Sequence, residues 1–273
     1  MDHVPSLVGA RVDQSAPVPL YTSPAHSVYW VGSQEDSPFR CNVYLIVDGD
    51  VVVLVDPGSE AHHFAQVRER VSRIVDPTRV THLILHHQDP DLCDSIPAWL
   101  RINPDLVLIC TPRTRVLLPY YGFSPDVAWI DVSPTDSTVL ELPSGKVLGF
   151  LTSPFLHFPE ACTTFDETSG FLFSSDIGAA IERDWRLVVD DWEAHWRTMV
   201  PFHVFYMASN RAMRGFLHKI DPFPITAILP QHGSIIPAHH VRAAIAALRE
   251  LPCGIDLLYP ASNLESVMTA LRR

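Results

Sequence analysis

The stretch "LILHHQDPDLCDS", residues 83–95, follows an apolar run with two histidines and three aspartates. The spacing His87-x-Asp89-x-Asp91 lets alternate side chains of an extended segment point the same way, and Pro90 biases Asp89 toward that extended form. Because neighbouring carboxylates repel one another without a cation, the cluster favours a bound metal ion. The alternative is a polar loop that closes a strand, and taken alone the stretch leaves both interpretations open.

The segments around this stretch predict strands and helices in alternation. Residues 28–33, 41–50 and 51–59 indicate strands, with an Asp-Gly hairpin turn at residues 48–50. A helix is expected at residues 60–75, because apolar side chains recur there at helical spacing. Strands at 80–87 and 106–111 and helices at 94–104 and 114–122 follow.

The second half also combines strands and helices. Strands are predicted at 127–132, 137–154 and 170–176, a helical region at 190–220, a strand at 225–233 and an amphipathic helix at 238–250. Two β-rich halves, each with its own helices, imply an α+β fold in which a sandwich of sheets is covered by helices on the outside. Since no linker or repeat stands out, we expect one domain over residues 1–273.

Composition excludes several classes of function. The chain of 273 residues has a formal charge of −11 and no basic stripe, which argues against a nucleic-acid partner. No signal peptide precedes the first strand and no apolar run approaches the length of a membrane span, so we expect no membrane and a cytoplasmic location. The five cysteines are dispersed without a CxxC pair, which favours buried reduced thiols over disulfides or a zinc finger.

Polar side chains also end other predicted apolar strands. "GFLTSPFLH" ends in His157, "FLFSSD" in Asp176 and "ITAILPQH" in His232. A single histidine or aspartate at such a place is more often structural, but agreement between four segments favours metal. Imidazole and carboxylate ligands suit two ions of iron, manganese or zinc. The predicted ligands are His87, Asp89, Asp91, His157, Asp176 and His232, and Asp176 is the natural bridging carboxylate.

These motifs, above all "HFPEACTTFDETSGFLFSSD", resemble metallo-β-lactamase-fold proteins, and specifically the diiron domain of flavodiiron proteins and the oxygen-binding diiron proteins. The resemblance implies a metallo-β-lactamase-like αββα sandwich. It implies that His87, Asp89 and His157 bind the first iron, that Asp91 and His232 bind the second, and that Asp176 bridges them. The resemblance also gives Asp56 a supporting role behind the site.

The sequence departs from the diiron pattern at two positions. Asp89 stands where that branch has glutamate, and Leu92 stands where its motif ends in histidine. Leu92 cannot bind metal, so the second ion loses a potential ligand and a position is open for water or a small molecule. Histidines 62, 63, 86, 239 and 240 follow no such pattern and are expected to be surface or supporting residues.

Three functions remain open. The first is a nonheme diiron protein that binds O2 or another diatomic ligand as an oxygen sensor or carrier, with Leu92, Phe155 and Phe158 as candidates for an apolar pocket. The second is an O2 or NO reductase supplied by a separate redox protein, since we expect no flavodoxin domain and no FMN in this chain. The third is a dizinc hydrolase. Whether the protein is an enzyme stays open, as do a signalling partner and a homodimer through residues 238–250 and the tail "GIDLLYP".

Overall fold

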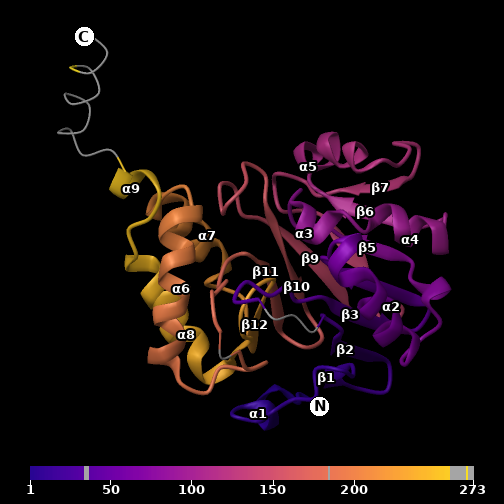
Figure 1. Cartoon of the computed structure of the whole chain (residues 1–273), viewed down its shortest axis with the longest axis horizontal. Helices are drawn as coiled ribbons and strands as arrows, with labels where there is room; N and C mark the ends of the chain where they lie inside the picture. Colours follow the sequence, from indigo (N-terminus) through magenta and orange to yellow (C-terminus); the bar gives the residue numbers. More distant parts are fainter. Residues whose placement is uncertain (34–36, 184, 259–268, 270–273) are drawn as a thin grey trace.

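Two sheets lie face to face between two groups of helices in the computed structural model, which describes residues 1–33, 37–183, 185–258 and 269 (Figure 1). The first sheet has the strand order β1-β2-β3-β4-β5-β6-β7 and the second has the order β13-β12-β11-β10-β9-β8. This arrangement confirms the predicted α+β sandwich with helices on its outer faces.

The first sheet changes from antiparallel to parallel pairing in its middle. Its strands up to β4 pair antiparallel, and those from β4 to β7 pair parallel. Parallel strands need crossover connections, and the helices in these connections cover the outer face of the sheet. The strands are β1 (Val18–Thr22), β2 (His26–Trp30), β3 (Tyr44–Asp48), β4 (Val51–Val55), β5 (His82–Ile84), β6 (Val107–Cys110) and β7 (Ala128–Asp131).

The second sheet is antiparallel except where β11 pairs with β12. Its strands are β8 (Val139–Glu141), β9 (Val147–Thr152), β10 (Cys162–Asp166), β11 (Phe171–Ser175), β12 (Ala227–Pro230) and β13 (Ile236–Pro237). The register of β11 against β12 shifts between Phe173 and Ser175, and Ser175 has a positive φ of 53°. This irregularity lies directly before Asp176, at the end of the sheet that carries the predicted metal ligands.

The helices divide between the two outer faces (Figure 1). On the first sheet lie α2 (Ala65–Ser72), α3 (Pro90–Cys93), α4 (Ile96–Ile102) and α5 (Pro112–Leu117), and on the second lie α6 (Trp192–Tyr206), α7 (Asn210–Ile220) and α8 (Ala238–Glu250). Two short helices, α1 (Val4–Leu7) and α9 (Ile255–Leu258), lie near the ends of the described chain. None of the helices in the described ranges is both long and apolar enough to cross a lipid bilayer.

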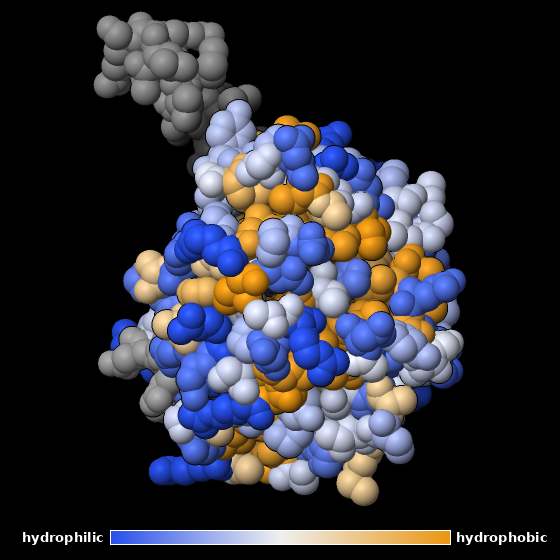
Figure 2. Space-filling view, turned by 90° about the vertical axis from the view of Figure 1, so that its right-hand side faces the viewer, coloured by the Kyte–Doolittle hydropathy of each residue, from blue (hydrophilic) through white to orange (hydrophobic). Residues whose placement is uncertain are grey.

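Apolar side chains fill three layers. Trp30, Tyr44 and Phe173 belong to the layer between the sheets. Trp99 of α4 lies in the layer outside the first sheet, and Phe216 of α7 lies in the layer outside the second. Full burial of one such side chain stabilises the fold by roughly 1.5–3 kcal/mol, so all three layers hold the sheets in place. On the outer surface, by contrast, hydrophilic and apolar residues are interspersed, as Figure 2 shows for the face at the right of Figure 1.

Several predicted boundaries differ from the structure. Residues 60–75 do not form one regular helix, because a π-helical turn at Glu60–Phe64 precedes α2. The region 190–220 forms two helices, because the chain is extended at Met207 and Ser209 between α6 and α7. The Ser209 side chain caps the start of α7 by accepting a hydrogen bond from the Ala212 N–H. The prediction that a strand ends in His157 is wrong, because β9 stops at Thr152 and His157 lies in the loop that follows.

The helix predicted at 238–250 is confirmed, and it packs its apolar side on the second sheet through Val241, Ala244 and Leu248. Because this packing already buries the apolar side of the helix, it gives no support to a homodimer through the helix, which stays a prediction. Residues 259 and 260 of the tail named with it lie outside the described residues. The single domain over residues 1–273 also stays a prediction.

Candidate metal centre

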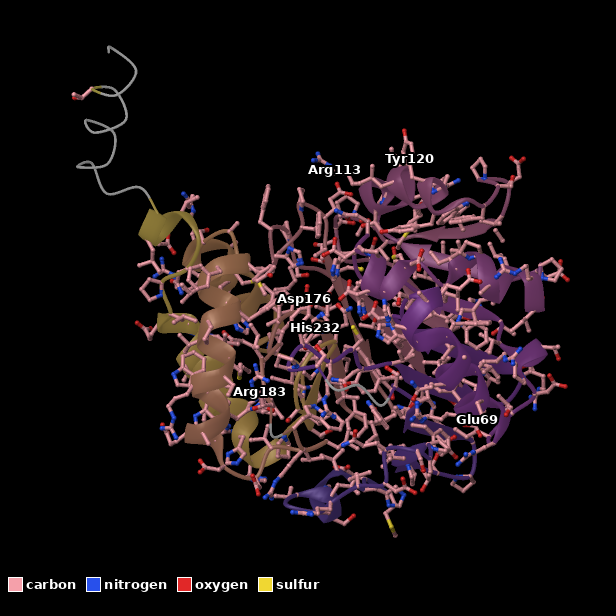
Figure 3. The ribbon with its side chains drawn as sticks, in the orientation of Figure 1. Glu69, Arg113, Tyr120, Asp176, Arg183 and His232 are labelled. Carbon is pink, nitrogen blue, oxygen red and sulfur yellow. The ribbon has the colours of Figure 1, made fainter. Side chains whose placement is uncertain are left out.

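All six predicted ligands come together at one end of the sandwich. His87 follows β5, Asp176 follows β11 and His232 follows β12, as the sequence predicts. Asp89 is the residue before α3, and Asp91 lies inside that helix. Figure 3 shows Asp176 and His232 next to one another between the two groups of helices, and their side chains lie 3.6 Å apart.

The first group consists of His87, Asp89 and His157, whose ligand atoms all lie within 4.8 Å of one another. Asp89 Oδ2 is 3.6 Å from His87 Nε2 and 3.5 Å from His157 Nε2. These two nitrogens and one oxygen converge on a single point, as the ligands of one metal ion do.

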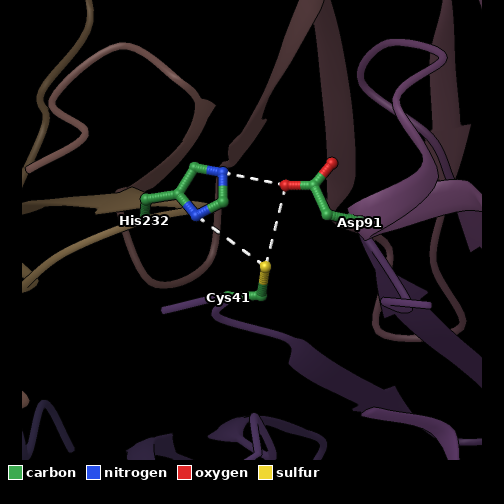
Figure 4. A group of neighbouring side chains, drawn as sticks. All are labelled: Cys41, Asp91 and His232. Carbon is green, nitrogen blue, oxygen red and sulfur yellow. Dashed lines mark hydrogen bonds and ion pairs between the residues drawn. The ribbon is translucent and has the colours of Figure 1, made fainter. Parts of the chain in front are cut away.

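The second group consists of Asp91, His232 and Cys41, again within 4.8 Å of one another. His232 Nε2 lies 3.1 Å from Asp91 Oδ2, and Cys41 Sγ lies 3.7 Å from the same oxygen (Figure 4). Cys41 was not among the predicted ligands, because a cysteine without a CxxC partner carries no ligand signal in the sequence. Its position three residues before the apolar strand β3 is the one sequence feature that could have drawn attention to it.

Asp176 lies between the two groups. Its Oδ2 is 3.4 Å from His87 Nε2 and 2.9 Å from His157 Nε2, whereas its Oδ1 is 3.6 Å from His232 Nε2. One carboxylate therefore offers one oxygen to each group, which is the geometry that a bridging ligand requires.

The outer nitrogens of two imidazole rings are held by other groups. His87 Nδ1 lies 3.0 Å from Ser175 Oγ, and His232 Nδ1 lies 2.9 Å from the carbonyl oxygen of Arg40. Such partners fix the orientation of metal-binding histidines and leave the other nitrogen for the metal. The structure thus directs Nε2 of both rings toward the centre.

The charges around Asp176 suit a cation, once a metal ion displaces the proton from His157. Burial raises the pKa of Asp176, but the charge of His87 and the hydrogen bond from His157 together lower it to about 2. Burial lowers the pKa of His157, yet its hydrogen bonds with Asp176 and Asp89 raise it to about 9. The Asp176 carboxylate is therefore ionised at neutral pH, which metal coordination needs.

A buried polar atom provides an independent test of whether the residues fit a metal ion. Asp176 Oδ1 is buried and accepts no hydrogen bond from the described residues. A buried carboxylate oxygen without a partner is costly, and a cation is its most favourable neighbour. Together with nitrogen and oxygen ligands on both sides, this atom fits a two-metal centre.

A cavity of about 1000 Å³ opens onto the centre. Its walls include the aromatic side chains of Phe39, Phe202 and Tyr206, and Phe39 stacks on the His232 ring at 3.7 Å between centroids. Of the two phenylalanines predicted to form an apolar pocket, Phe158 stacks on the His87 ring, whereas the side chain of Phe155 is 51% exposed. The apolar wall of the cavity therefore comes largely from residues that the sequence did not indicate.

Leu92 does not contribute to this wall, contrary to the expectation. Its side chain is fully buried in the layer between the first sheet and its helices, and it is not among the residues that line the cavity. The position that the diiron pattern gives to a histidine is thus occupied by a core side chain.

His86 is a buried supporting residue and not a surface one. Its ring nitrogens lie 2.7 Å from Asp56 Oδ2 and 2.9 Å from Thr164 Oγ1, and its backbone N–H donates to Asp56 Oδ1. Asp56 therefore holds the backbone directly before His87. His62 and His63 also lie at the cavity, where Ser59 N–H donates to His63 Nδ1.

Comparisons with known proteins agree with this geometry. A solved structure described as the peroxy diiron species of the chemotaxis sensor ODP shares 30% identity over 92% of this chain and 99% of that chain, with a TM-score of 0.79. The apo state of the chemotaxis sensor ODP from T. denticola shares 31% identity over 91% of this chain and 98% of that one, with a TM-score of 0.78. These similarities confirm the metallo-β-lactamase-like fold.

A curated relative, the nitric oxide reductase of Moorella thermoacetica, is 29% identical over 71% of this chain. The match spans only 49% of that relative, and it spans 23% of the diflavin flavoprotein A 1 of Synechocystis, which is 31% identical over half of this chain. The family described as "ODP family beta lactamase" matches residues 39–233. Since this match covers most of the sequence and all six predicted ligands, the chain belongs to the ODP beta-lactamase family.

Proposed function

We propose that the protein holds two iron ions and binds O2 at this site, as an oxygen sensor or carrier. In this proposal His87, Asp89 and His157 bind the first ion, Asp91 and His232 bind the second, and Asp176 bridges the two. The observation that carries the proposal is the placement of the two Asp176 oxygens, one toward each group. Nitrogen and oxygen ligands of this kind suit iron.

A bound pair of ferrous ions would supply electrons to O2, so that the gas could be held reversibly. Side chains around the proposed metal ligands hold those ligands in position and limit the access of water to the centre. Phe39 covers the ring of His232 and Phe158 covers the ring of His87, so both halves of the centre have an aromatic neighbour. Gln231 Nε2 donates to Asp91 Oδ2 at 3.1 Å and fixes the orientation of that carboxylate. The solved structure described as a peroxy diiron species of the chemotaxis sensor ODP supports O2 as the ligand.

The test is anaerobic reconstitution with ferrous iron, followed by exposure to air. We expect two iron ions per chain and a new visible absorption band after air is admitted. Loading with manganese or zinc under the same conditions is the control for metal identity. The absence of a new band in protein that holds two iron ions would contradict O2 binding, and failure to retain any metal would contradict the centre itself.

A second candidate function is reduction of O2 or NO with electrons from a separate redox protein. It is favoured by the relative described as a nitric oxide reductase. Steady consumption of O2 or NO in the presence of an electron donor would support it, whereas one equivalent of bound O2 without turnover supports the sensor or carrier. Retention of zinc and hydrolysis of an ester would instead support the dizinc hydrolase.

We also propose a cytoplasmic location and, for a sensor, a separate signalling partner. All five cysteines are buried as thiols in the described structure, in keeping with a reducing compartment. Labelling of these thiols in denatured protein taken from cells tests this point, because disulfides would leave some of them unlabelled.

A further inference from the structure

We propose that the thiolate of Cys41 is a ligand of the second metal ion. The two halves of the centre would then differ, with nitrogen and oxygen ligands in the first and a sulfur ligand in the second. This inference rests on the proposed two-metal function and adds a ligand to it. When the metal binds, the bond between Sγ and the metal replaces the S–H bond, and the proton passes to solvent.

Backbone contacts fix Cys41 beside the second group. Cys41 forms an isolated antiparallel bridge with His232, and Asn42 N–H donates to the carbonyl oxygen of Gln231 at 2.6 Å. The Asn42 side chain also donates to the carbonyl oxygens of Pro230 and Gly233. The segment before β3 is therefore tied to both sides of His232, and the sulfur is buried at the wall of the cavity.

The distances agree with a shared metal ion. A metal–sulfur bond of about 2.3 Å and a metal–oxygen bond of about 2.1 Å place sulfur and oxygen roughly 3.6 Å apart in a tetrahedral site. Cys41 Sγ lies 3.7 Å from Asp91 Oδ2. The separation between His232 Nε2 and Asp91 Oδ2, 3.1 Å, also lies in the range for two ligands of one ion. Figure 4 shows the sulfur of Cys41 between Asp91 Oδ2 and the His232 ring, where it lies 3.8 Å from Nδ1.

An oxygen of Asp176 beside the second group also points to a cation. Asp176 is 1% exposed, and its Oδ1 lies 3.6 Å from His232 Nε2 without a hydrogen-bond partner among the described residues. This oxygen is the fourth donor beside Cys41, Asp91 and His232. With it, each half of the centre has four protein ligands, since the first half has His87, His157, Asp89 and Asp176.

Cys41 also accounts for the absence of a histidine at position 92. Leu92 packs in the core and provides no ligand, so the second ion would have one fewer protein donor than the first. A thiolate from the opposite wall provides that donor from a different element. The competing interpretation is that the Cys41 thiol only donates a hydrogen bond to Asp91.

Cobalt(II) distinguishes these interpretations, because a thiolate ligand gives an intense near-ultraviolet charge-transfer band that nitrogen and oxygen ligands do not give. The full chain, freed of metal, is titrated anaerobically with cobalt while bound cobalt is measured by equilibrium dialysis. We expect two cobalt ions per chain and the charge-transfer band. In Cys41→Ser the band disappears, and the affinity for one of the two ions falls about tenfold or more.

Cys93→Ala is the matched control, because Cys93 is another buried thiol near the centre and donates to the carbonyl oxygen of His87. It should keep the band. X-ray absorption at the cobalt edge of the unsubstituted protein gives the same answer without any variant: a sulfur neighbour at about 2.3 Å is expected. Two bound cobalt ions without sulfur would overturn the role of Cys41 and leave the proposed function standing. Failure to bind cobalt at all would overturn both.

Discussion

Asp176 Oδ2 lies 2.9 Å from His157 Nε2, so the residue that ends β11 meets a loop residue that follows β9. Its other oxygen faces the second group of ligands. The proposed bridge between the two ions therefore depends on a single side chain.

Asp176→Asn should abolish the two-metal centre. The amide has one oxygen and no charge, so it cannot bind two cations, and we expect the iron content to fall from two ions per chain to one or fewer. Iron is measured by plasma emission after desalting, with circular dichroism to confirm folding. Asp136→Asn is the control, since that carboxylate pairs with Lys219 away from the centre. Retention of two ions by Asp176→Asn would contradict the bridging role.

Phe39→Ala should shorten the lifetime of bound O2. The Phe39 ring stacks on His232 and on Phe202, and its loss would admit water to the second half of the centre. After exposure to air, the visible band should decay several times faster, at an unchanged iron content. Phe123→Ala, which removes a ring packed against Trp129, is the control. Equal decay in both variants would show that Phe39 does not protect the site.

Asp56→Ala should destabilise the metal-free protein. Asp56 is buried and accepts hydrogen bonds from the backbone and the ring of His86. Loss of this acceptor, at a residue whose φ is 50°, should lower the free energy of unfolding by about 1–3 kcal/mol. Urea unfolding measures this change.

Asp56→Asn is the informative companion variant. Asparagine tolerates a positive φ and its Oδ1 can still accept from the His86 N–H, so we expect a clearly smaller loss than with alanine. Equal losses in the two variants would mean that the backbone hydrogen bond contributes nothing measurable.

His26 joins the two sheets and makes stability depend on pH. Its Nδ1 lies 2.9 Å from Asp48 Oδ2 and its Nε2 lies 2.9 Å from Asp166 Oδ2, and all three side chains are buried. Burial lowers the pKa of His26, but the hydrogen bonds and charges of the two carboxylates raise it above its usual value. The charged ring thus contributes stability below the unfolded-state pKa of about 6.5, and this contribution is lost as the pH rises through the folded-state pKa.

The measurement is the thermal midpoint of the metal-free protein from pH 6 upward, compared with His26→Gln. The variant leaves two buried carboxylates without a cation, which costs about 3–5 kcal/mol when the partner is charged. We expect the difference between the two proteins to shrink as the pH rises. A difference that grows with pH would contradict a protonated His26.

The sequence by itself determined the fold class and the identity of six candidate ligands. Apolar strands with period-two or continuous burial and helices with one apolar face are local patterns, so residues 238–250 could be predicted to the residue. The motif around His87 and Asp91 is equally local, because its side chains are close in the chain.

Only the tertiary structure decided how these side chains share the centre. Cys41 and His232 are separated by 191 positions, and their contact depends on the pairing of two distant segments that no local pattern encodes. The same holds for Phe39 on His232 and for the orientation of Leu92 into the core. Local residue types therefore specify which candidate ligands are present, whereas packing between the sheets decides which of them face one another.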